Sequence, residues 1–311
     1  MVDMRVNIGG IELTNPVMPG SGTIAEGIAK AADLSLLGAV VTKTITKDLR
    51  EGNPPPRVAE LPNATLFSIG IPSKGPEHFI NTIVPFYQSF NVPLIASISA
   101  DTADDFAALA KRISVPGVSA IEANISCPNL KKNGEAFAMS VQATRDVISA
   151  MKAATDVPIW AKLSPNVGDI AEIARSAEAA GADALVCANA MLAMGVDVQT
   201  RLPKLATITG GITGAATKPI ILRMAYQCVE AVSIPVVGCG GIMDVDDALE
   251  YMLAGCTAVQ VGTANFISVS TMSKIIAGID DYCTKHGFAK VADVVGAMGI
   301  HEPPIIHAGR L

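Results

Sequence analysis

Eight short apolar runs, each ending in small or polar residues, constrain the fold of this 311-residue chain more than any other feature. They are NPVMPGSG (15–22), AVVTKTI (39–45), PLIASIS (93–99), AIEANIS (120–126), PIWAKLS (158–164), ALVCANA (184–190), PVVGCGG (235–241) and AVQVGTA (258–264). The runs are nearly continuously apolar rather than alternating, which is typical of parallel strands buried on both faces. Hydrophobic residues make up 50% of the chain, which is enough for a large core.

Helical patterns lie between most of these runs. They cover 101–114, 140–155, 168–180 and 244–255. Asp101 is the expected N-cap of the first helix, and Gly181 and Gly255 are expected to end the third and fourth. Eight strand–helix units predict a (β/α)₈ barrel, formed by one domain that spans residues 1–311. A doubly wound open sheet is the alternative, but no GxGxxG follows the first run.

Two further segments decorate the predicted barrel. Residues 4–15 read as a β-hairpin that turns at Gly9–Gly10, before the first barrel strand. The stretch 46–92 is too long for one helix and contains the Pro-rich sequence GNPPPR (52–57). We therefore expect an inserted loop or small subdomain over the mouth of the barrel.

Composition disfavours several classes of function. The net charge is −6 with no Lys/Arg cluster, which argues against nucleic acid as a partner. The apolar runs are broken well before the roughly 18 residues of a membrane span, and the N-terminus lacks a signal-peptide core, so a cytoplasmic protein is expected. None of the six cysteines has CxxC spacing, so neither a metal site nor structural disulfides are expected.

In a barrel of this kind the active site lies at the carboxyl ends of the strands. The residues at those ends are Ser21, Gly22, Lys43, Thr44, Ser97, Asn124, Cys127, Asn129, Lys162, Asn189, Gly240, Gly241, Gly262 and Thr263. This set has lysines, amides, a thiol and glycine turns, but no carboxylate pair and no histidine cluster. Hydrolysis by paired acids and metal-assisted chemistry therefore lack their residues.

Individual residues allow more than one interpretation. The glycine turns that follow the last two runs suit a phosphate, although glycine also merely permits tight turns. Lys162 could stabilise negative charge on a reduced flavin ring, form a Schiff base, or extend to the rim, and Lys43 poses the same question. The asparagines at 124, 129 and 189 suit a planar ligand with amide edges, or cap turns.

Several motifs together resemble one known family. They are NPVMPGSGT, TKTITKDLREGNPPPRVAE, NISCPN, AKLSPN, TGGITGAATKPIILRMAYQ and GGIMDVDDALEYMLAGCTAVQVGTANF. Over nearly the whole chain the sequence is similar to class 1 dihydroorotate dehydrogenases, and most to the 1B branch. The resemblance implies an FMN-binding (β/α)₈ barrel that oxidises dihydroorotate to orotate in pyrimidine biosynthesis.

The resemblance also implies a role for individual positions. Cys127 would remove the proton at C5 of the substrate, and the hydride from C6 would go to N5 of FMN. The positions implied to contact FMN are Ser21, Lys43, Thr44, Ser97, Asn124, Lys162, Ala188, Gly214, Gly240, Gly241, Gly262 and Thr263. Those implied to contact substrate are Lys43, Phe67, Ile69, Gly70, Ile71, Asn124, Asn129, Asn189 and Ala190.

Three positions depart from the family pattern. Phe67 stands where the family's substrate loop, Asn-x-Ile-Gly-Leu, begins with an amide. Ala190 stands where a Thr or Ser usually follows Asn189, and Ser97 stands where the 1B branch often has Asn. A site that has lost hydrogen-bonding groups discriminates differently among ligands. An alternative is therefore the same flavin chemistry on a different cyclic or conjugated acid.

The 1B likeness further implies a partner subunit that carries FAD and a [2Fe–2S] cluster and passes electrons to NAD⁺. A homodimeric core is a further implication of the family. Two other classes of protein stay open from the residues alone. One is a lyase or isomerase that binds a phosphorylated metabolite and uses Lys162 as a Schiff-base lysine. The other is a non-catalytic scaffold.

Overall fold

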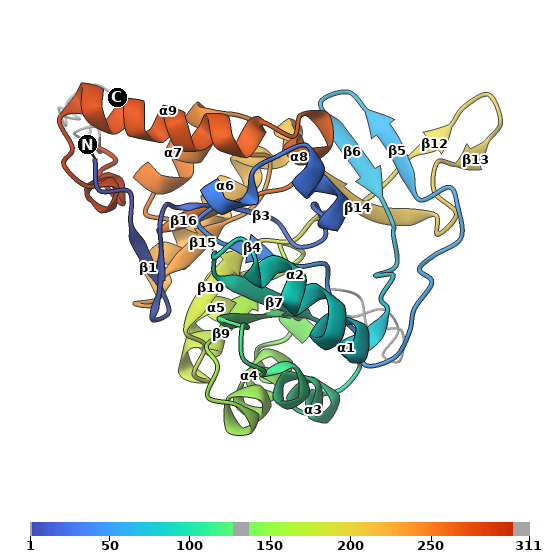
Figure 1. The fold of residues 1–311 in the computed structure, drawn as a ribbon. Coiled ribbons are helices and arrows are strands. Elements are labelled where there is room, and N and C mark those ends of the chain that lie inside the picture. Colours follow the sequence, from blue (N-terminus) through green and yellow to red (C-terminus); the bar gives the residue numbers. More distant parts are fainter. Residues whose placement is uncertain (1, 127–136, 301–311) are drawn as a thin grey trace, which may run out of the picture.

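Eight parallel strands form the centre of the molecule. The computed structural model describes residues 2–126 and 137–300 (Figure 1). The barrel strands are β3 (Val17–Pro19), β4 (Val40–Val41), β7 (Leu94–Ile98), β8 (Ala120–Asn124), β9 (Ile159–Lys162), β10 (Ala184–Cys187), β15 (Val236–Gly238) and β16 (Ala258–Val261). They pair in the order β3-β16-β15-β10-β9-β8-β7-β4. The amide of Gly38, just before β4, donates to the carbonyl of Val17 in β3 at 2.9 Å, which joins the two edges.

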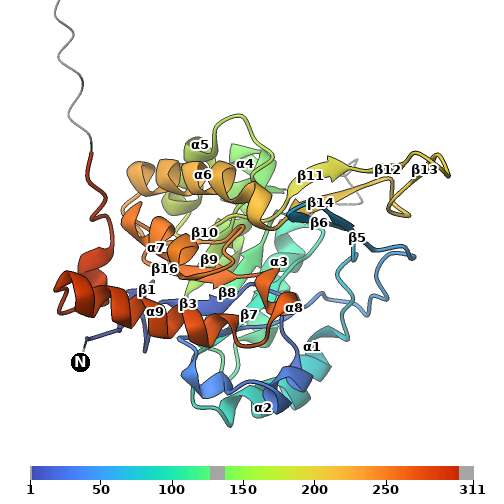
Figure 2. The same ribbon diagram turned by 90° about the horizontal axis from the view of Figure 1, so that it is seen from above.

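Each of the eight apolar runs contains one barrel strand, so the predicted (β/α)₈ barrel is confirmed. Helices surround the strands in Figure 2. They are α1 (Gly75–His78), α2 (Val84–Gln88), α3 (Ala103–Ile113), α4 (Val141–Ala154), α5 (Ile170–Ala179), α6 (Lys218–Ala231), α7 (Val245–Leu253), α8 (Ala264–Ile267) and α9 (Thr271–His286). Buried aliphatic residues of the strands and of the inner helix faces form one continuous core.

The predicted helix ends are correct except for one N-cap. Thr102, not Asp101, caps α3, because its side chain accepts from the amide of Asp105 and its backbone is extended. Threonine and aspartate are both good N-caps, so the sequence alone did not separate the two neighbours. Gly181 and Gly255 follow α5 and α7 with φ of +95° and +104°, as the predicted helix ends require.

The predicted N-terminal hairpin is present. Strands β1 (Val6–Ile8) and β2 (Ile11–Leu13) pair antiparallel around Gly9 and Gly10, which have φ of +57° and +87°. Gly9 lies against Asp183, the residue before β10, since a side-chain carbon on Gly9 would be 2.9 Å from the Cβ of Asp183. The hairpin therefore covers the amino-terminal end of the barrel, opposite the strand ends that carry the polar residues.

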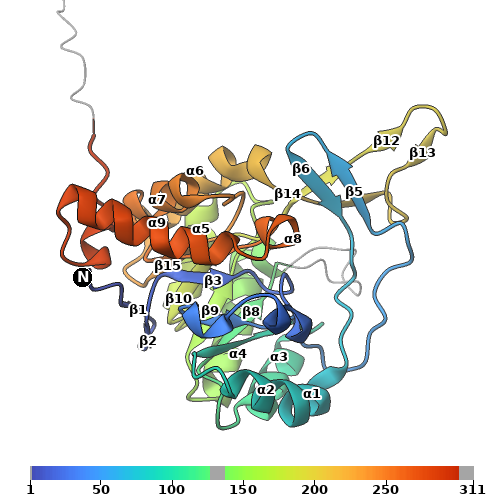
Figure 3. The same ribbon diagram turned by 45° about the horizontal axis from the view of Figure 1, so that its top comes forward.

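A second sheet is built from two insertions. Its strands, in spatial order, are β11 (Met191–Met194), β14 (Thr209–Thr213), β6 (Ala64–Phe67) and β5 (Val58–Leu61). The predicted insertion at 46–92 supplies β5 and β6, whereas its later part forms α1 and α2 beside the barrel. The ribbon of β12 (Val196–Asp197) and β13 (Leu202–Pro203) extends beyond this sheet, on the side away from the N-terminus (Figure 3).

The sequence patterns did not predict strands β11 to β14. These strands are short, and Gly210 and Gly211 in β14 have low intrinsic strand propensity. Strand β6, which pairs with β14, lies more than a hundred residues earlier, so local periodicity does not reveal this pairing. Within the described part of the chain, no helix combines the length and the apolar character that crossing a membrane requires.

Candidate functional site

A network of amides and hydroxyls lies at the carboxyl ends of β4, β7, β8 and β10. The hydroxyl oxygens of Thr44 and Ser97 are 3.0 Å apart, and the side-chain amide of Asn124 donates to Thr44 Oγ1 at 3.2 Å. Ser126 Oγ donates to Asn124 Oδ1 at 2.8 Å. The amide of Asn189 donates to Ser126 Oγ at 2.6 Å and to Asn124 Oδ1 at 3.3 Å.

This network fixes the orientation of four predicted site residues. Thr44, Ser97 and Asn124 are almost fully buried, whereas Asn189 is half-buried and faces the opening. Buried polar groups held by several hydrogen bonds keep one geometry, and they can present donors and acceptors to a ligand without reorganising. The structure thus brings four strand ends together into one preorganised polar surface.

Lys162, at the end of β9, is buried inside the barrel. Its ammonium donates to Ser21 Oγ at 3.2 Å and to Gln260 Oε1 at 3.1 Å, and it lies 3.7 Å from Glu122 Oε2. Only 4% of the residue is exposed, so Lys162 does not extend to the rim. The ion pair favours the charged ammonium, whereas a Schiff base needs the neutral amine.

Lys43 sits differently, on the outer part of the opening. It is exposed, and its side chain packs over Gly22, where an added carbon would be 2.9 Å from Lys43 Cδ and Nζ. Gly22 has φ of +77° and leaves room for the long lysine side chain. The two lysines therefore occupy two levels of the barrel end, one buried and one solvent-facing.

Glycine turns after β14, β15 and β16 meet at one side of the opening. A side-chain carbon on Gly241 would lie 2.8 Å from the carbonyl oxygen of Gly214, which brings these two turns into contact. The carbonyl of Gly240 accepts from the hydroxyl of Tyr251 at 2.7 Å, and Thr263 Oγ1 donates to Thr213 at 3.3 Å.

At Gly262, the nearest atom to an added carbon is Thr23 Cγ2 at 4.0 Å, so this turn faces open space. Exposed amides of such turns can bind a phosphate.

Phe67 and Ala190 lie together at the edge of the amide network. Phe67 ends β6 opposite Gly211, and a carbon added to Gly211 would be 2.7 Å from Ala190 Cβ and 3.2 Å from Phe67 Cζ. Ala190 follows Asn189, whose side-chain oxygen accepts from the Ala190 amide at 2.7 Å. The two departures from the family pattern thus both lie against Gly211, beside the network.

The remaining predicted site residues are Ala188, the segment 69–71, Cys127 and Asn129. Ala188 is 3% exposed and donates its amide to the carbonyl of Cys239 at 2.9 Å. The segment Ile69–Gly70–Ile71 lies against Asn53, whose amide donates to the Ile69 carbonyl at 3.0 Å, so the Pro-rich loop supports it. Cys127 and Asn129 lie outside the described residues.

The sequence profile described as dihydroorotate dehydrogenase matches residues 3–282. The chain belongs to the dihydroorotate dehydrogenase family.

Close relatives carry the same family name. A protein from Bacteroides fragilis is 44% identical over 303 residues, which cover 96% of this chain and 100% of the relative. One from Phocaeicola vulgatus is 45% identical over 303 residues, with the same coverage. One from Trichlorobacter lovleyi is 44% identical over 298 residues, 95% of this chain and 98% of the relative. All three are named dihydroorotate dehydrogenase B (NAD(+)), catalytic subunit.

The sequence analysis did not identify three residues that belong to the site. Glu122 and Gln260 contact Lys162, and Ser126 joins Asn124 to Asn189. Two of them could have been found, because Glu122 is a carboxylate inside the run AIEANIS and Gln260 is an amide inside the run AVQVGTA. A polar side chain in a buried strand needs a partner, so each could have been matched with the buried lysine.

The described cysteines are free thiols in apolar surroundings. Burial raises the pKa of Cys239, although the ammonium of Lys162 nearby opposes this effect. Burial also raises the pKa of Cys256 and Cys283. A thiol with a raised pKa is a poor nucleophile. Over residues 2–126 and 137–300, no three His, Cys, Asp or Glu side chains are grouped to hold a metal ion.

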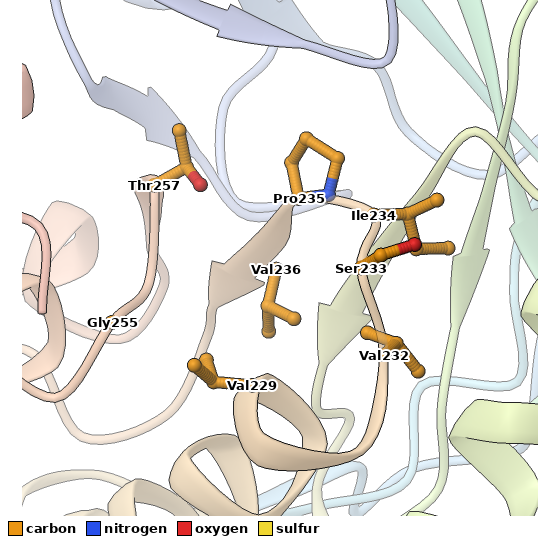
Figure 4. Close-up of a pocket in the computed structure, with 8 residues that line it drawn as sticks. All are labelled: Val229, Val232, Ser233, Ile234, Pro235, Val236, Gly255 and Thr257. Atoms are coloured by element: carbon orange, nitrogen blue, oxygen red, sulfur yellow. The ribbon is translucent and has the colours of Figure 1, made fainter.

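A separate hollow of about 210 Å³ lies at the other end of the barrel (Figure 4). It is lined by residues at the amino-terminal ends of β15 and β16, including Val236 and Thr257. Ser233, in its wall, donates its hydroxyl and its amide to Glu178 Oε1 at 2.6 Å and 2.8 Å. The hollow lies at the opposite end of the barrel from the glycine turns, so it is not part of the candidate site.

Proposed function

We propose that this chain oxidises dihydroorotate to orotate with bound FMN, as the catalytic step of pyrimidine biosynthesis that its relatives' names describe. The observation that carries the proposal is family membership over residues 3–282, combined with a buried lysine, an amide network and glycine turns at one barrel end. The named relatives favour this substrate over a different cyclic acid. The chain would act as an oxidoreductase in the cytoplasm.

The residues at the barrel end fit an FMN molecule. The turns at Gly214, Gly240–Gly241 and Gly262–Thr263 would hold the phosphate, since the Gly262 turn faces open space and Gly241 tolerates no side chain. Lys162, supported by Ser21, would interact with the negatively charged edge of the ring system, and Thr44, Ser97, Asn124 and Ala188 would line it. A bound flavin supplies a two-electron hydride acceptor that no side chain provides.

The substrate would bind over the amide network. Asn124 and Asn189 are oriented by Ser126 and can each donate and accept hydrogen bonds with a cyclic amide. Asn129, Lys43 and the Ile69–Ile71 segment would complete the binding surface. Phe67 and Ala190 would contribute an apolar wall in place of the polar contacts that the family pattern has there.

Cys127 is the proposed general base that removes the C5 proton. Support comes from its place in NISCPN, directly after Ser126 and three residues after Asn124, both of which belong to the network. A thiol can act as a base when its pKa matches the step. Burial raises the pKa of Cys239, Cys256 and Cys283, which makes these thiols poor candidates for this role.

The relatives' names distinguish a catalytic subunit of an NAD(+) enzyme, which supports a second subunit for electron transfer. We propose that this partner carries FAD and a [2Fe–2S] cluster and reduces NAD⁺. A homodimer of the present chain would form the core of the assembly.

Anaerobic titration of the purified yellow protein with dihydroorotate tests the proposal. We expect the flavin absorbance to bleach, and orotate to form in equal amount. Cys127→Ala should keep FMN bound but slow bleaching by at least about 100-fold, the usual scale for losing a general base. The matched control is Cys283→Ala, a buried thiol on α9, which should reduce at the wild-type rate. Protein that contains flavin but is not bleached by dihydroorotate would contradict the proposal.

A further inference from the structure

Glu122 and Gln260 form a buried polar cluster with Lys162 inside the barrel. We propose that they are positioning residues that set how much of the Lys162 charge acts on the bound flavin, and thereby set its reduction potential. This inference rests on the proposed function, because it needs a flavin beside Lys162. Neither Glu122 nor Gln260 belongs to the amide network or to the glycine turns.

Gln260 bridges the two charged groups. Its side-chain carbonyl accepts from the Lys162 ammonium at 3.1 Å, and its side-chain NH₂ donates to Glu122 Oε2 at 2.8 Å. The carboxylate can only accept and the ammonium can only donate, so together they fix which way the amide of Gln260 points. The ammonium and the carboxylate are consequently held 3.7 Å apart rather than in direct contact.

Burial makes this arrangement electrostatically strong. Glu122 and Gln260 have no exposed surface, and Lys162 is 4% exposed. Charges removed from water interact more strongly than exposed ones, and a buried carboxylate needs a partner. Glu122 Oε1 accepts no hydrogen bond from the described residues, whereas Oε2 contacts both Gln260 and Lys162.

The strand register places Glu122 beneath the lysine. Asn124 on β8 is level with Lys162 on β9, and Glu122 pairs with Trp160, two residues closer to the amino-terminal end. Side chains two residues apart on a strand share a face, so Glu122 lies one layer deeper on the same face as Asn124. The carboxylate therefore lies behind the ammonium as seen from the mouth and does not compete with a ligand there.

This geometry gives the two residues different effects on charge. The Glu122 carboxylate offsets part of the positive charge that Lys162 presents to the mouth. Gln260 holds the ammonium away from that carboxylate and toward the flavin. Among the described residues, the thiol of Cys239 also lies close to this cluster, and burial keeps it neutral by raising its pKa. Removing Glu122 or Gln260 should therefore change the flavin potential in opposite directions.

The test uses the FMN-loaded protein with two nearly isosteric variants. Glu122→Gln leaves the ammonium uncompensated, which favours the reduced, negatively charged flavin. We expect its midpoint potential to rise by at least the equivalent of a tenfold change in equilibrium constant, about 30 mV for a two-electron couple. Gln260→Met lets the ammonium close on Glu122, so its potential should fall. Glu178→Gln, the same chemical change at the far end of the barrel, should leave the potential unchanged.

A purely structural role would alter thermal stability and FMN affinity without opposite shifts in potential. An unchanged potential in Glu122→Gln, or shifts of the same sign in both variants, would overturn the inference. Should Glu122→Gln fail to fold, the sign in Gln260→Met decides alone, because an unchanged or raised potential contradicts the mechanism. The proposed function is tested separately, by the bleaching of the wild-type flavin with dihydroorotate. The midpoint potentials do not depend on that substrate, so failure of the proposed function is distinguishable from failure of this inference.

Discussion

Phe67 and Ala190 meet over Gly211, because a side-chain carbon on that glycine would lie 3.2 Å from Phe67 Cζ and 2.7 Å from Ala190 Cβ. The three residues come from β6, from the end of the β10 loop and from β14. The ring of Phe67, the methyl group of Ala190 and the backbone of Gly211 therefore lie close together beside Asn189. Their sizes are matched, so a change at one position constrains the other two.

Gly211→Ala should destabilise the protein by about 1–3 kcal/mol, the usual cost of overpacking. Gly211 has no left-handed backbone, so the loss comes from the contact with Ala190 rather than from strain. Thermal or denaturant unfolding measures the effect. Gly168→Ala is the matched control, because its added carbon meets nothing within 4 Å and should change stability by less than about 0.5 kcal/mol.

The pair Phe67→Asn and Ala190→Thr should tighten orotate binding together more than either change does alone. Each restores a polar group beside Asn189, and one hydrogen bond is worth about 0.5–1.5 kcal/mol, or roughly two- to tenfold in Kd. Orotate titration followed by the flavin spectrum gives the affinities of all four proteins. An unchanged orotate affinity in all three variants would mean that the wall of Phe67 and Ala190 does not contact the substrate.

Tyr251→Phe should weaken FMN binding by about five- to tenfold. The Tyr251 hydroxyl donates to the Gly240 carbonyl at 2.7 Å and so holds one proposed phosphate turn in place. Equilibrium dialysis of the apoprotein with FMN gives the affinity. Tyr226→Phe removes a hydroxyl on α6 without touching that hydrogen bond, and it should bind FMN as the wild type does. Equal losses in both variants would count against the role of Gly240.

Stability should decline at alkaline pH through Lys218. Burial lowers the pKa of Lys218, but hydrogen bonds to Asp247 and Glu250, at 2.6 Å and 2.7 Å, raise it above 10.5. A group with a raised folded-state pKa contributes stability below its unfolded pKa and loses it as pH rises through the folded value. The melting temperature should therefore fall above about pH 10.5. Lys218→Met should reduce this part of the fall, and an identical pH profile in that variant would refute the assignment.

The barrel was predictable from sequence because both faces of its strands are buried. Runs such as AVVTKTI and ALVCANA begin with consecutive apolar residues, a pattern that is typical of parallel strands buried on both faces. The strand ends were predictable because small and polar residues follow the apolar start of each run. This is why Thr44, Asn124 and Asn189 could be named in advance and do meet in one network.

The partners of the buried lysine were not predictable in the same way. Glu122 and Gln260 are 138 residues apart, and their contact depends on the order in which the strands close into a barrel. The second sheet escaped prediction for a similar reason, because β6 and β14 pair across most of the chain. Local patterns specify elements, whereas pairings between distant elements depend on the whole fold.

The sheet of β11, β14, β6 and β5 has a consequence for how this chain can be recombined with its relatives. Two of its strands come from the insertion at 46–92 and two from residues 190–214, and the backbone hydrogen bonds between β6 and β14 join the two segments. A chimera that exchanges one insertion alone would leave β6 and β14 mismatched. The two segments form one transferable module, and substrate preference should move between homologues only when both are grafted together.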